Sequence, residues 1–376
     1  MNDEITYQRE VPEITPEQLR QMLETGRPVV VVDVRPLAER LEWEIPGSFH
    51  ADVYADLRNG HLDVLDCLSF PSKHPIVVVC GSGYISRIGT KVLCERGYTA
   101  FSLTGGMKAW SLAWNTALLK TARRTEIVQV RRTGKGCLSY VFGADGKAAV
   151  IDASLAPEVY ERIAIGRNWQ ICHILDTHIH ADHLSRGRLL ANLFGACLHL
   201  PIQERVHFPF SPLKEGDELL VGTASLKVLQ TPGHTRESTS YLLDEAVVFT
   251  GDTLFLDGVG RPDLEADTEE ARVQARLLYR SLAKLLALPE QVIVLPGHSS
   301  RPIPFDDVPL AATLADVYRR VELLQVGEEA FVSTILRRLP PTPPNYSTII
   351  TANESGELPV DDVTDLEAGA NRCAVS

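Results

Sequence analysis

Residues 177–183 read Thr-His-Ile-His-Ala-Asp-His, and three later motifs share their character: Thr231-Pro232-Gly233-His234, Thr250-Gly251-Asp252 and Pro296-Gly297-His298. Each motif follows a short apolar run, at residues 171–175, 226–229, 246–250 and 292–295. Such runs, closed by Gly, Pro or His, predict buried strands that end at one edge of a sheet. Imidazole nitrogens and carboxylate oxygens bind divalent transition metals, and rigid strand ends fix their geometry. The pattern therefore favours a metal site over a loop with two hydrogen-bonded histidines.

A second pattern lies upstream and ends in a cysteine. Residues 29–33 and 76–80 are apolar runs followed by turn residues and helical patterns, and the second run ends in Cys80. Alternating strands and helices predict an α/β fold with a parallel sheet and with function at the carboxyl ends of its strands. Cys80 enters a glycine-rich loop before a helix N-terminus, where backbone amides and the helix dipole stabilise a thiolate. This favours a nucleophile over a buried inert thiol, which is our interpretation of the other cysteines.

Residues 12–114 resemble a rhodanese domain. The resemblance rests on residues 31–35 (VVDVR), residues 45–48 (IPGS), the Cys80 loop and residues 103–110 (LTGGMKAW). It implies a sulfurtransferase in which Cys80 carries a persulfide, with Asp33 and Arg35 as a buried structural pair. The loop residues that would cradle the persulfide are Gly81, Ser82, Gly83, Tyr84, Ile85, Ser86 and Arg87.

The Cys80 loop departs from part of that family. Many members that use thiosulfate carry Arg directly after the cysteine and again later, whereas this chain has Gly81 and Ile85. The sequence Cys-Gly-Ser-Gly is closer to the mercaptopyruvate-type loop, and Arg87 is a candidate for the missing charge. A phosphatase motif, Cys-x5-Arg, does not fit the position of Arg87.

Residues 126–304 resemble the metallo-β-lactamase fold, an αββα sandwich, and within it the persulfide dioxygenases. The resemblance rests on residues 135–140 (KGCLSY), the His178 motif, residues 231–235 (TPGHT), residues 250–253 (TGDT) and residues 260–263 (GRPD). It implies one Fe(II) per chain, held by His178, His234 and Asp252, with open positions for sulfur and O2. The residues that would orient these ligands, or form a vacant second metal site, are His180, Asp182, His183 and His298. Arg261 would bind the carboxylate of the thiol.

The two resemblances together imply a sulfur-oxidising enzyme. A low-molecular-weight persulfide, such as glutathione persulfide, would react with O2 to give sulfite and the thiol. The Cys80 persulfide and sulfite would then give thiosulfate, or the rhodanese domain would supply persulfide to the iron. The sequence leaves open the direction of transfer and the thiol that carries the persulfide.

Two alternatives remain at this point. Because Asp182, His183 and His298 are all present, a dinuclear zinc centre bridged by Asp252 could cleave thioesters, as in glyoxalase II. Against it, we do not recognise the glutathione-binding helices of that family in residues 305–376, and the GRPD segment fits the dioxygenases better. The other alternative is a non-catalytic sulfur carrier with a structural metal, although structural zinc prefers closed, cysteine-rich sites.

Composition limits the partners. With 376 residues, 44% hydrophobic residues, 23% charged residues and a net charge of −12, the chain is typical of an ordinary globular protein. The net charge argues against nucleic acid or an anionic membrane as partner. A polar N-terminus and an irregular cysteine pattern favour the cytoplasm, and the fold is compatible with a homodimer or higher homo-oligomer.

The motifs described above also predict the domain organisation. We expect a rhodanese-like domain at 1–117 and a metallo-β-lactamase-like domain at 118–310. Helices and a proline-rich arm, residues 340–346, should occupy 311–352, and the polar tail at 353–376 should be disordered.

Overall fold

The structure is a computed structural model that describes residues 10–66, 68–71, 73–122, 125–358, 363–369 and 371–375. The chain divides into two compact units. Unit 1 holds the described residues up to Trp114, together with Thr133–Lys135 and Pro304–Asp306, and unit 2 holds the remainder. The boundary expected at 117 falls inside strand β6 (Asn115–Lys120), which pairs with β7 (Glu126–Arg131) in unit 2.

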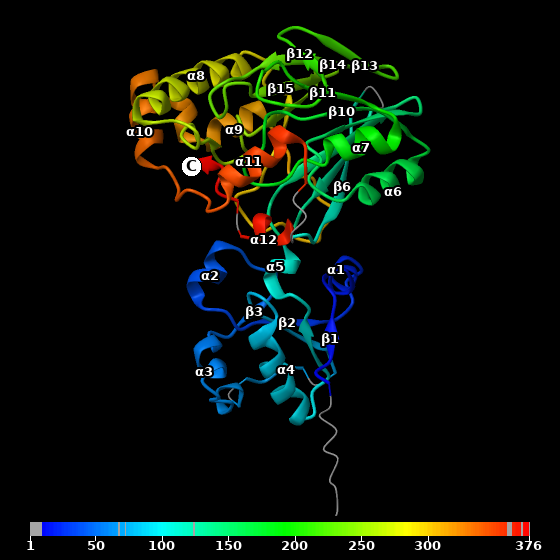
Figure 1. Cartoon of the computed structure of the whole chain (residues 1–376), viewed down its shortest axis with the longest axis vertical. Coiled ribbons are helices and arrows are strands. Elements are labelled where there is room, and N and C mark those ends of the chain that lie inside the picture. Colours follow the sequence, from blue (N-terminus) through cyan, green and yellow to red (C-terminus); the bar gives the residue numbers. More distant parts are fainter. Residues whose placement is uncertain are drawn as a thin grey trace, which may run out of the picture. The chain divides into compact units, whose positions relative to one another are not determined.

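Unit 1 is built on a parallel five-stranded sheet with the order β1-β5-β4-β2-β3. Its strands are β1 (Glu13–Ile14), β2 (Val30–Asp33), β3 (Phe49–His50), β4 (Ile76–Val79) and β5 (Ala100–Leu103). Its helices are α1 (Pro16–Glu24), α2 (Leu37–Glu42), α3 (Tyr54–Arg58), η1 (Asp63–Leu65), α4 (Tyr84–Glu95) and α5 (Gly106–Trp110) (Figure 1). The valine runs of β2 and β4 are buried, as a sheet covered on both faces requires. The predicted parallel α/β architecture is therefore confirmed.

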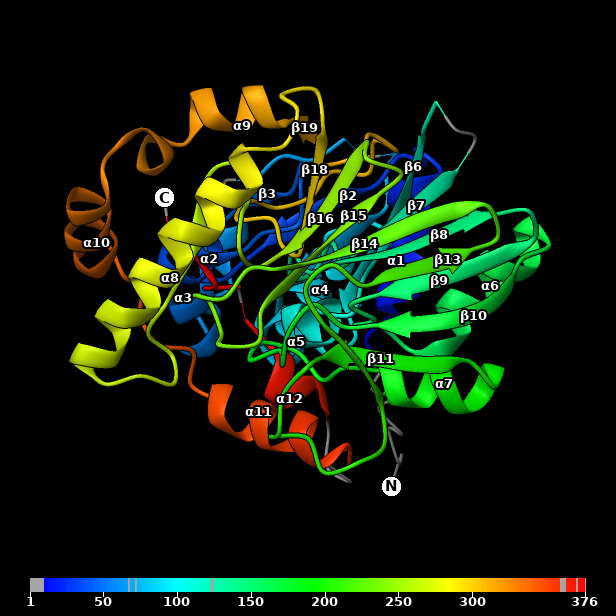
Figure 2. The same ribbon diagram turned by 90° about the horizontal axis from the view of Figure 1, so that it is seen from above.

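Unit 2 contains two larger sheets, and Figure 2 shows them as neighbouring layers with helices outside. The first, in the order β12-β11-β10-β9-β8-β7-β6, adds β8 (Leu138–Ala144), β9 (Lys147–Ile151), β10 (Gln170–Leu175), β11 (Cys197–Pro201) and β12 (Ser211–Leu213). The second contains β13 (Glu218–Val221), β14 (Ala224–Gln230), β15 (Thr239–Leu243), β16 (Val247–Gly251), β18 (Ile293–Pro296) and β19 (Ala312–Thr313). Phe142 of β8 and Phe249 of β16 stack with ring centroids 5.8 Å apart. Aromatic contacts of this kind join the two sheets into a sandwich.

The helices of unit 2 cover the outer faces of the sandwich. They are α6 (Pro157–Arg167), α7 (Gly187–Phe194), α8 (Thr268–Leu286), α9 (Leu314–Arg320), η2 (Glu322–Gln325), α10 (Glu328–Arg337), α11 (Tyr346–Ser355) and α12 (Val363–Glu367). On one side, the Tyr160 hydroxyl of α6 lies 2.8 Å from Ser139 Oγ of β8. On the other, Leu278 of α8 and Phe331 of α10 share a core cluster with Val294 of β18. The predicted αββα sandwich is confirmed.

The four strands that precede the motifs are all present, as β10, β14, β16 and β18. They do not belong to one sheet, however, because β10 lies in the first sheet and the other three lie in the second. The sequence expectation of a single sheet edge is corrected accordingly. A sandwich brings the ends of both sheets to one rim, so one site can draw on two layers.

The C-terminal stretch departs from the expectation of disorder at 353–376. Helix α12 and strand β20 (Ala374–Val375) lie within it, and β20 pairs antiparallel with β17 (Val259–Gly260). Glu367 and Val375 are buried, with 0% and 1% of their surface exposed. A tail with buried side chains and strand pairing is part of the fold of unit 2.

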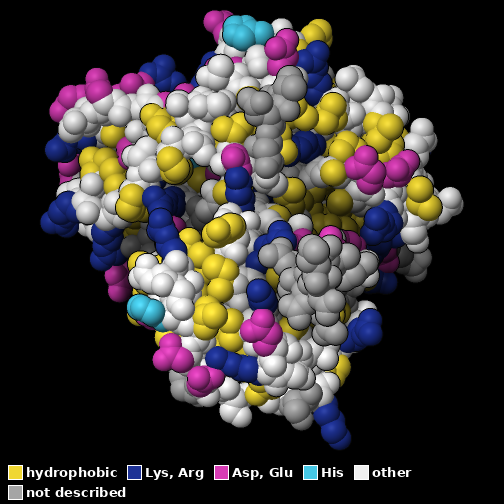
Figure 3. Space-filling view, turned by 60° about the horizontal axis from the view of Figure 1, so that its bottom comes forward, with side chains coloured by type: hydrophobic (Ala, Val, Ile, Leu, Met, Phe, Trp, Pro, Cys, Tyr) yellow, Lys and Arg dark blue, Asp and Glu magenta, His cyan; other side chains and the backbone are white. Residues whose placement is uncertain are grey.

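Helix hydropathy and surface charge bear on possible contact with membranes or other anionic partners. Among the described residues, no helix is both long and apolar enough to cross a bilayer. On the face shown in Figure 3, Lys and Arg side chains are interspersed with Asp and Glu. Such mixing gives no extended positive potential on that face.

Candidate metal centre and sulfur-transfer loop

His178, His234 and Asp252 converge at the rim of the sandwich. Each offers one ligand atom, and the three atoms lie within 4.8 Å of one another in a buried group. Asp252 Oδ2 is 4.0 Å from His178 Nε2 and 3.6 Å from His234 Nε2. The structure thus brings together the three residues that the sequence suggested as ligands. Two imidazoles and one carboxylate on one side leave further positions of a bound ion open.

The hydrogen-bond partners of His178 and His234 indicate which ring nitrogen of each carries the proton. Thr177 Oγ1 donates a hydrogen bond to Asp152 Oδ2 at 2.9 Å, so its oxygen is left to accept from His178 Nδ1, also at 2.9 Å. His234 Nδ1 donates to the Arg261 carbonyl oxygen at 2.8 Å. With both Nδ1 atoms protonated, each Nε2 carries a lone pair that points into the group. Second partners of this kind orient metal-binding histidines.

Two of the atoms that face the centre of the group lack a hydrogen-bond partner among the described residues. His178 Nε2 and Asp252 Oδ2 are buried without a hydrogen bond within the described part of the chain. Burial, and then the neighbouring His180, hold the pKa of His178 well below its usual value, so the ring is neutral. Burial raises the pKa of Asp252, but the charge of His298 outweighs it and the pKa falls below its usual value. A neutral imidazole and an ionised carboxylate are the forms that bind metal, so these residues fit a metal ion.

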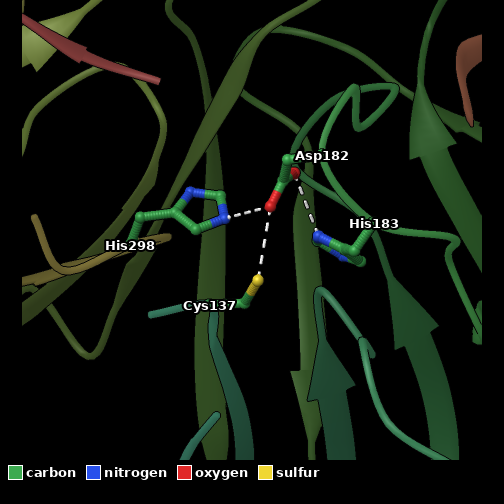
Figure 4. A group of neighbouring side chains, drawn as sticks. All are labelled: Cys137, Asp182, His183 and His298. Carbon is green, nitrogen blue, oxygen red and sulfur yellow. Dashed lines mark hydrogen bonds and ion pairs between the residues drawn. The ribbon is translucent and has the colours of Figure 1, made fainter. Parts of the chain in front are cut away.

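A second group lies beside the first and consists of Cys137, Asp182, His183 and His298 (Figure 4). Asp182 is its centre: Oδ2 contacts His298 Nε2 at 2.8 Å and Cys137 Sγ at 3.3 Å, and Oδ1 contacts His183 Nδ1 at 3.1 Å. The other ring nitrogen of His298, Nδ1, lies 2.6 Å from Asp252 Oδ1. His298 therefore links the two groups through two carboxylates.

Charge pairing dominates the second group. Burial lowers the pKa of His298, yet Asp182 and Asp252 outweigh it and raise the pKa well above its usual value. In His183 the Asp182 carboxylate likewise outweighs burial and raises the pKa to about 10. Burial and Asp182 raise the pKa of Cys137, but hydrogen bonds with His183 and His298 bring it down to about 7. Hydrogen bonds within the second group and to Asp252 engage both nitrogens of His298 and Nδ1 of His183, whereas His183 Nε2 is buried without a partner within the described residues.

His180 is not in the group of three candidate ligands, although its ring lies beside that of His178, with centroids 4.3 Å apart. It forms a buried group with Asp152 and Asp176, and its Nε2 is 3.2 Å from Asp152 Oδ1. The same Asp152 accepts the Thr177 hydroxyl that orients His178. This position agrees with an indirect role for His180, acting through the residues that hold the ligands.

Arg261 occupies a different place from the one expected of a substrate-binding residue. Its side chain is 1% exposed and forms two 2.8 Å hydrogen bonds to the Asp263 carboxylate. The guanidinium also donates to the carbonyl oxygens of Pro341 and Arg372, each at 3.2 Å. Because its donors are engaged, these contacts favour a structural role over the predicted contact with a thiol carboxylate.

Two hollows reach the first group. One, of about 300 Å³, is lined by His234, Arg236, Arg205 and Glu265, with Ile350 of α11 at its wall. The other, of about 130 Å³, reaches His178 and is lined by residues of α7 and by Asn353 of α11. The larger hollow has the mixed charge that suits a zwitterionic thiol.

In unit 1, Cys80 follows β4 and is 1% exposed. The backbone N–H groups of Gly83 and Ser86 donate to Cys80 Sγ at 3.2 and 3.3 Å, and Sγ lies 3.3 Å from Ser86 Oγ. Gly83 has φ of +88°, a conformation open to glycine, which turns its N–H toward the sulfur. The predicted loop therefore surrounds Cys80 with amide donors, as an anionic sulfur requires.

Other residues of the loop lie away from the sulfur. Arg87 Nη1 pairs with Glu13 Oε1 at 3.2 Å, and the Arg87 side chain is 54% exposed. Tyr84 is exposed as well. The suggestion that Arg87 supplies a charge to Cys80 is not supported by this pairing. Asp33 and Arg35 form the expected buried pair, with Arg35 Nη2 2.7 Å from Asp33 Oδ2.

Two residues at the metal groups were not singled out from the sequence, where both were taken as inert thiols. Cys137 belongs to the second group, and Cys373 forms a further buried group with Asp252 and His298. The position of Cys137 directly before β8 was a usable signal, since it lies in the motif at 135–140. For Cys373 the sequence offered none.

Comparison with known proteins agrees with the two folds. The sequence profile of the rhodanese-like domain matches residues 15–113, and that of the metallo-beta-lactamase superfamily matches residues 132–298. The chain therefore joins an N-terminal rhodanese domain to a domain of the metallo-β-lactamase fold.

Among curated proteins, a hydroxyacylglutathione hydrolase of Rhizobium etli is 35% identical over 156 residues, which are 41% of this chain. The chain spans only 57% of that relative's length. Among solved structures, ETHE1 from Myxococcus xanthus is 26% identical with a TM-score of 0.53, covering 64% of this chain and 99% of that one. A metallo-beta-lactamase from Staphylococcus aureus is also 26% identical, with a TM-score of 0.57, covering 64% of this chain and 74% of that one.

Proposed function

We propose that the protein is a persulfide dioxygenase with a sulfurtransferase domain. A low-molecular-weight persulfide, such as glutathione persulfide, reacts with O2 and water to give the thiol, sulfite and two protons. The observation that carries the proposal is the first group, in which ligand atoms of His178, His234 and Asp252 converge and two of them, His178 Nε2 and Asp252 Oδ2, are buried without a hydrogen-bond partner within the described residues. Such a set suits one Fe(II) per chain, and bound iron would supply open positions for sulfur and O2.

The state of the second group supports one metal rather than two. Its members hold one another in charge-paired hydrogen bonds, and His298 is engaged at both nitrogens. A second ion would have to displace these contacts and remove protons from His298 and His183. The same contacts keep Asp252 Oδ1 occupied and turn Oδ2 toward the first group.

Other residues of the chain orient the ligand histidines and give the substrate access to the site. Thr177 and the Arg261 carbonyl hold the ligand histidines in one tautomer and orientation. The hollow beside His234 gives a thiol of peptide size a route to the site. Its lining includes Arg205 and Arg236, which pair with Glu265 and Glu270 and would exchange these partners for the carboxylates of the thiol. Excluding bulk water from the buried group strengthens each electrostatic contact inside it.

In the rhodanese domain we assign Cys80 as the sulfur carrier. A Cys80 persulfide would transfer its outer sulfur to sulfite, which gives thiosulfate and returns the Cys80 thiolate. The amides of Gly83 and Ser86 stabilise the anionic sulfur before and after transfer. Transfer in the opposite sense would load Cys80 from a donor and supply persulfide to the metal site.

The test is oxygen uptake by the Fe(II)-loaded full chain given glutathione persulfide, with sulfite and thiosulfate measured afterwards. We expect uptake with sulfite formation in the wild type, none in His178→Ala, and no loss in His207→Ala, an exposed histidine of the same unit. Cys80→Ser should keep oxygen uptake and lose thiosulfate formation, whereas Cys94→Ser should keep both. A carrier without catalysis would show no uptake in any variant.

A dinuclear hydrolase is the second candidate, favoured by the 35% identity to a hydroxyacylglutathione hydrolase. It requires the second group to bind zinc, with Asp252 as a bridge. Thioester cleavage by the zinc-loaded chain, lost in Asp182→Asn, together with no oxygen uptake from any persulfide, would replace the dioxygenase by this hydrolase.

A further inference from the structure

The C-terminal segment crosses the metal centre and carries a thiol. Cys373 Sγ, a carboxylate oxygen of Asp252 and a ring nitrogen of His298 lie within 4.8 Å of one another. Their residues are buried, with 1%, 2% and 3% of their surface exposed. Because both ring nitrogens of His298 are engaged by carboxylates, the Cys373 sulfur and the Asp252 carboxylate are the donors of this group that a single transition-metal ion could share.

Contacts on both sides of Cys373 fix its place. Its carbonyl oxygen accepts the backbone N–H of Arg261 at 2.9 Å, and its own N–H donates to Asn371 Oδ1 at 2.7 Å. Asn371 Nδ2 in turn lies 3.4 Å from Asp182 Oδ2. On the other side, Ala374 and Val375 pair with Gly260 and Val259.

Contacts of Val375 and Glu367 hold the segment around Cys373 in place. Val375 packs in the same core cluster as Leu254 and Val259. Upstream, the buried Glu367 carboxylate pairs with Arg132 at 2.8 Å and with Arg186 at 3.2 Å, and it accepts the Leu184 N–H at 2.7 Å. The position of the Cys373 thiol is thus fixed by contacts both before and after it in the chain.

We propose that Cys373 is a protein ligand of the metal, delivered to it by the C-terminal strand β20. The second observation that points to a ligand here is on Asp252, the residue that this group shares with the His178 group: its Oδ2 is buried without a hydrogen-bond partner in the part of the chain that the structure describes. A bound metal ion stabilises the thiolate over the thiol. An incoming persulfide then has to displace Cys373 or share the ion with it. The inference rests on metal binding at this centre and not on the oxygen chemistry proposed above.

The experiment is cobalt titration of the metal-free full chain under anaerobic conditions. Thiolate coordination gives a near-ultraviolet charge-transfer band, and the visible d–d bands report cobalt binding independently. We expect the charge-transfer band in the wild type, in Cys137→Ser and in Cys197→Ser, an exposed cysteine of the same unit. It should disappear in Cys373→Ser, with metal affinity reduced at least about tenfold.

Bound cobalt without the charge-transfer band in the wild type, or a band that persists in Cys373→Ser and is lost in Cys137→Ser, would overturn the proposal. If Cys373→Ser does not fold, X-ray absorption of zinc-loaded Cys137→Ser decides. A sulfur neighbour at about 2.3 Å supports Cys373, and a shell of nitrogen and oxygen alone rejects it. A sulfur neighbour together with no oxygen uptake would reject the dioxygenase function and leave this inference intact.

Discussion

Single hydrogen bonds decide which atom of each histidine faces the metal. Thr177 is the clearest case, because its hydroxyl donates to Asp152 and accepts from His178 Nδ1. Without this acceptor the His178 ring can rotate or change tautomer, and its Nε2 is no longer fixed toward Asp252. Thr177 is therefore a positioning residue, and its effect should appear in metal affinity.

We predict that Thr177→Val lowers metal affinity about 10- to 100-fold, because it removes the group that orients a ligand. The measurement is competition for Co(II) against a chelator of known affinity. Thr125→Val is the matched control, since Thr125 Oγ1 also donates to a buried carboxylate, Asp244, at 2.7 Å. Both variants should lose about 1–3 kcal/mol of stability. Equal metal affinity in the two would contradict the orienting role.

At the scale of single residues, the sequence predicted site residues well where a short local motif marks them. The motifs at His178, His234 and Asp252 identified three residues that converge, because each follows a short apolar run that forms a strand. Arg261 was misread for the opposite reason. A buried arginine that pairs with Asp263 and with two distant carbonyls looks the same in sequence as one that faces a substrate.

At the scale of elements, the Cys80 loop depends on the start of α5. Gly106 has φ of +58°, and a Cβ there would lie 2.3 Å from the Cys80 carbonyl oxygen and 2.6 Å from Gly83 N. Both clashes are with backbone, so the loop itself would have to move. The amides that surround Cys80 Sγ are therefore held in place by a neighbouring helix.

We predict that Gly106→Ala abolishes sulfur transfer from a persulfide donor to sulfite while unit 2 keeps its metal affinity. Gly97→Ala is the control, because Gly97 also has a positive φ, +86°, but nothing within 4 Å of its Cβ position. Both changes carry a left-handed backbone cost of about 1–2 kcal/mol. Only Gly106→Ala should lose transfer, as measured by thiosulfate formation. Similar losses in both would mean that backbone strain, not the loop clash, is responsible.

Helix α12 shows how a polar tail becomes part of a core. Burial raises the pKa of Glu367, but the charges of Arg132 and Arg186 outweigh it and the pKa lies below its usual 4.5. We predict that Glu367→Gln destabilises the fold by about 3 kcal/mol at pH 7, since two buried arginines lose their counter-charge. Urea unfolding provides the measurement. Glu329→Gln, an exposed ion pair with Arg276, should change stability by less than about 1 kcal/mol.

The same pair predicts a pH dependence. A carboxylate with a depressed folded-state pKa stabilises the fold above its unfolded pKa, and this stabilisation is lost as pH falls through the folded value. The difference between wild type and Glu367→Gln should therefore be constant above about pH 4.5 and shrink below it. A difference that stays constant down to acid unfolding would show that the pKa of Glu367 is the same in the folded and unfolded chain.

Elements with local signals were predicted well, and the tail was not. The apolar runs at 29–33 and 76–80 predicted strands, and these are β2 and β4. Residues 353–376 were interpreted as disordered because they are polar and acidic, yet Glu367 finds its partners in Arg132 and Arg186. Composition cannot reveal partners so distant in sequence. For the same reason the sequence did not reveal Cys373, which directly precedes β20, the strand that pairs with the distant β17.

At the scale of the whole molecule, the two candidate sites belong to separate compact units. Cys80 lies in unit 1, and both metal groups lie in unit 2. The alternation of strands and helices predicted the parallel α/β fold of unit 1, the resemblance to the metallo-β-lactamase fold implied the sandwich of unit 2, and both are present. The metal ligands nevertheless come from two sheets, because apolar runs report burial but not which layer a strand joins.

We predict that metal binding stabilises unit 2 alone. At a free metal concentration of 100 times the dissociation constant, linkage adds about 2.7 kcal/mol to the free energy of unfolding of the unit that binds. Hydrogen exchange of the full chain with and without zinc should therefore show new protection in the loops around His178, His234 and Asp252. Helix α4 and strand β4 of unit 1 should be unchanged. Asp252→Asn should lose the added protection while Cys80→Ser retains it, because only Asp252 belongs to the ligand group. Equal protection of α4 and β4 would instead mean that the two units unfold as one cooperative structure.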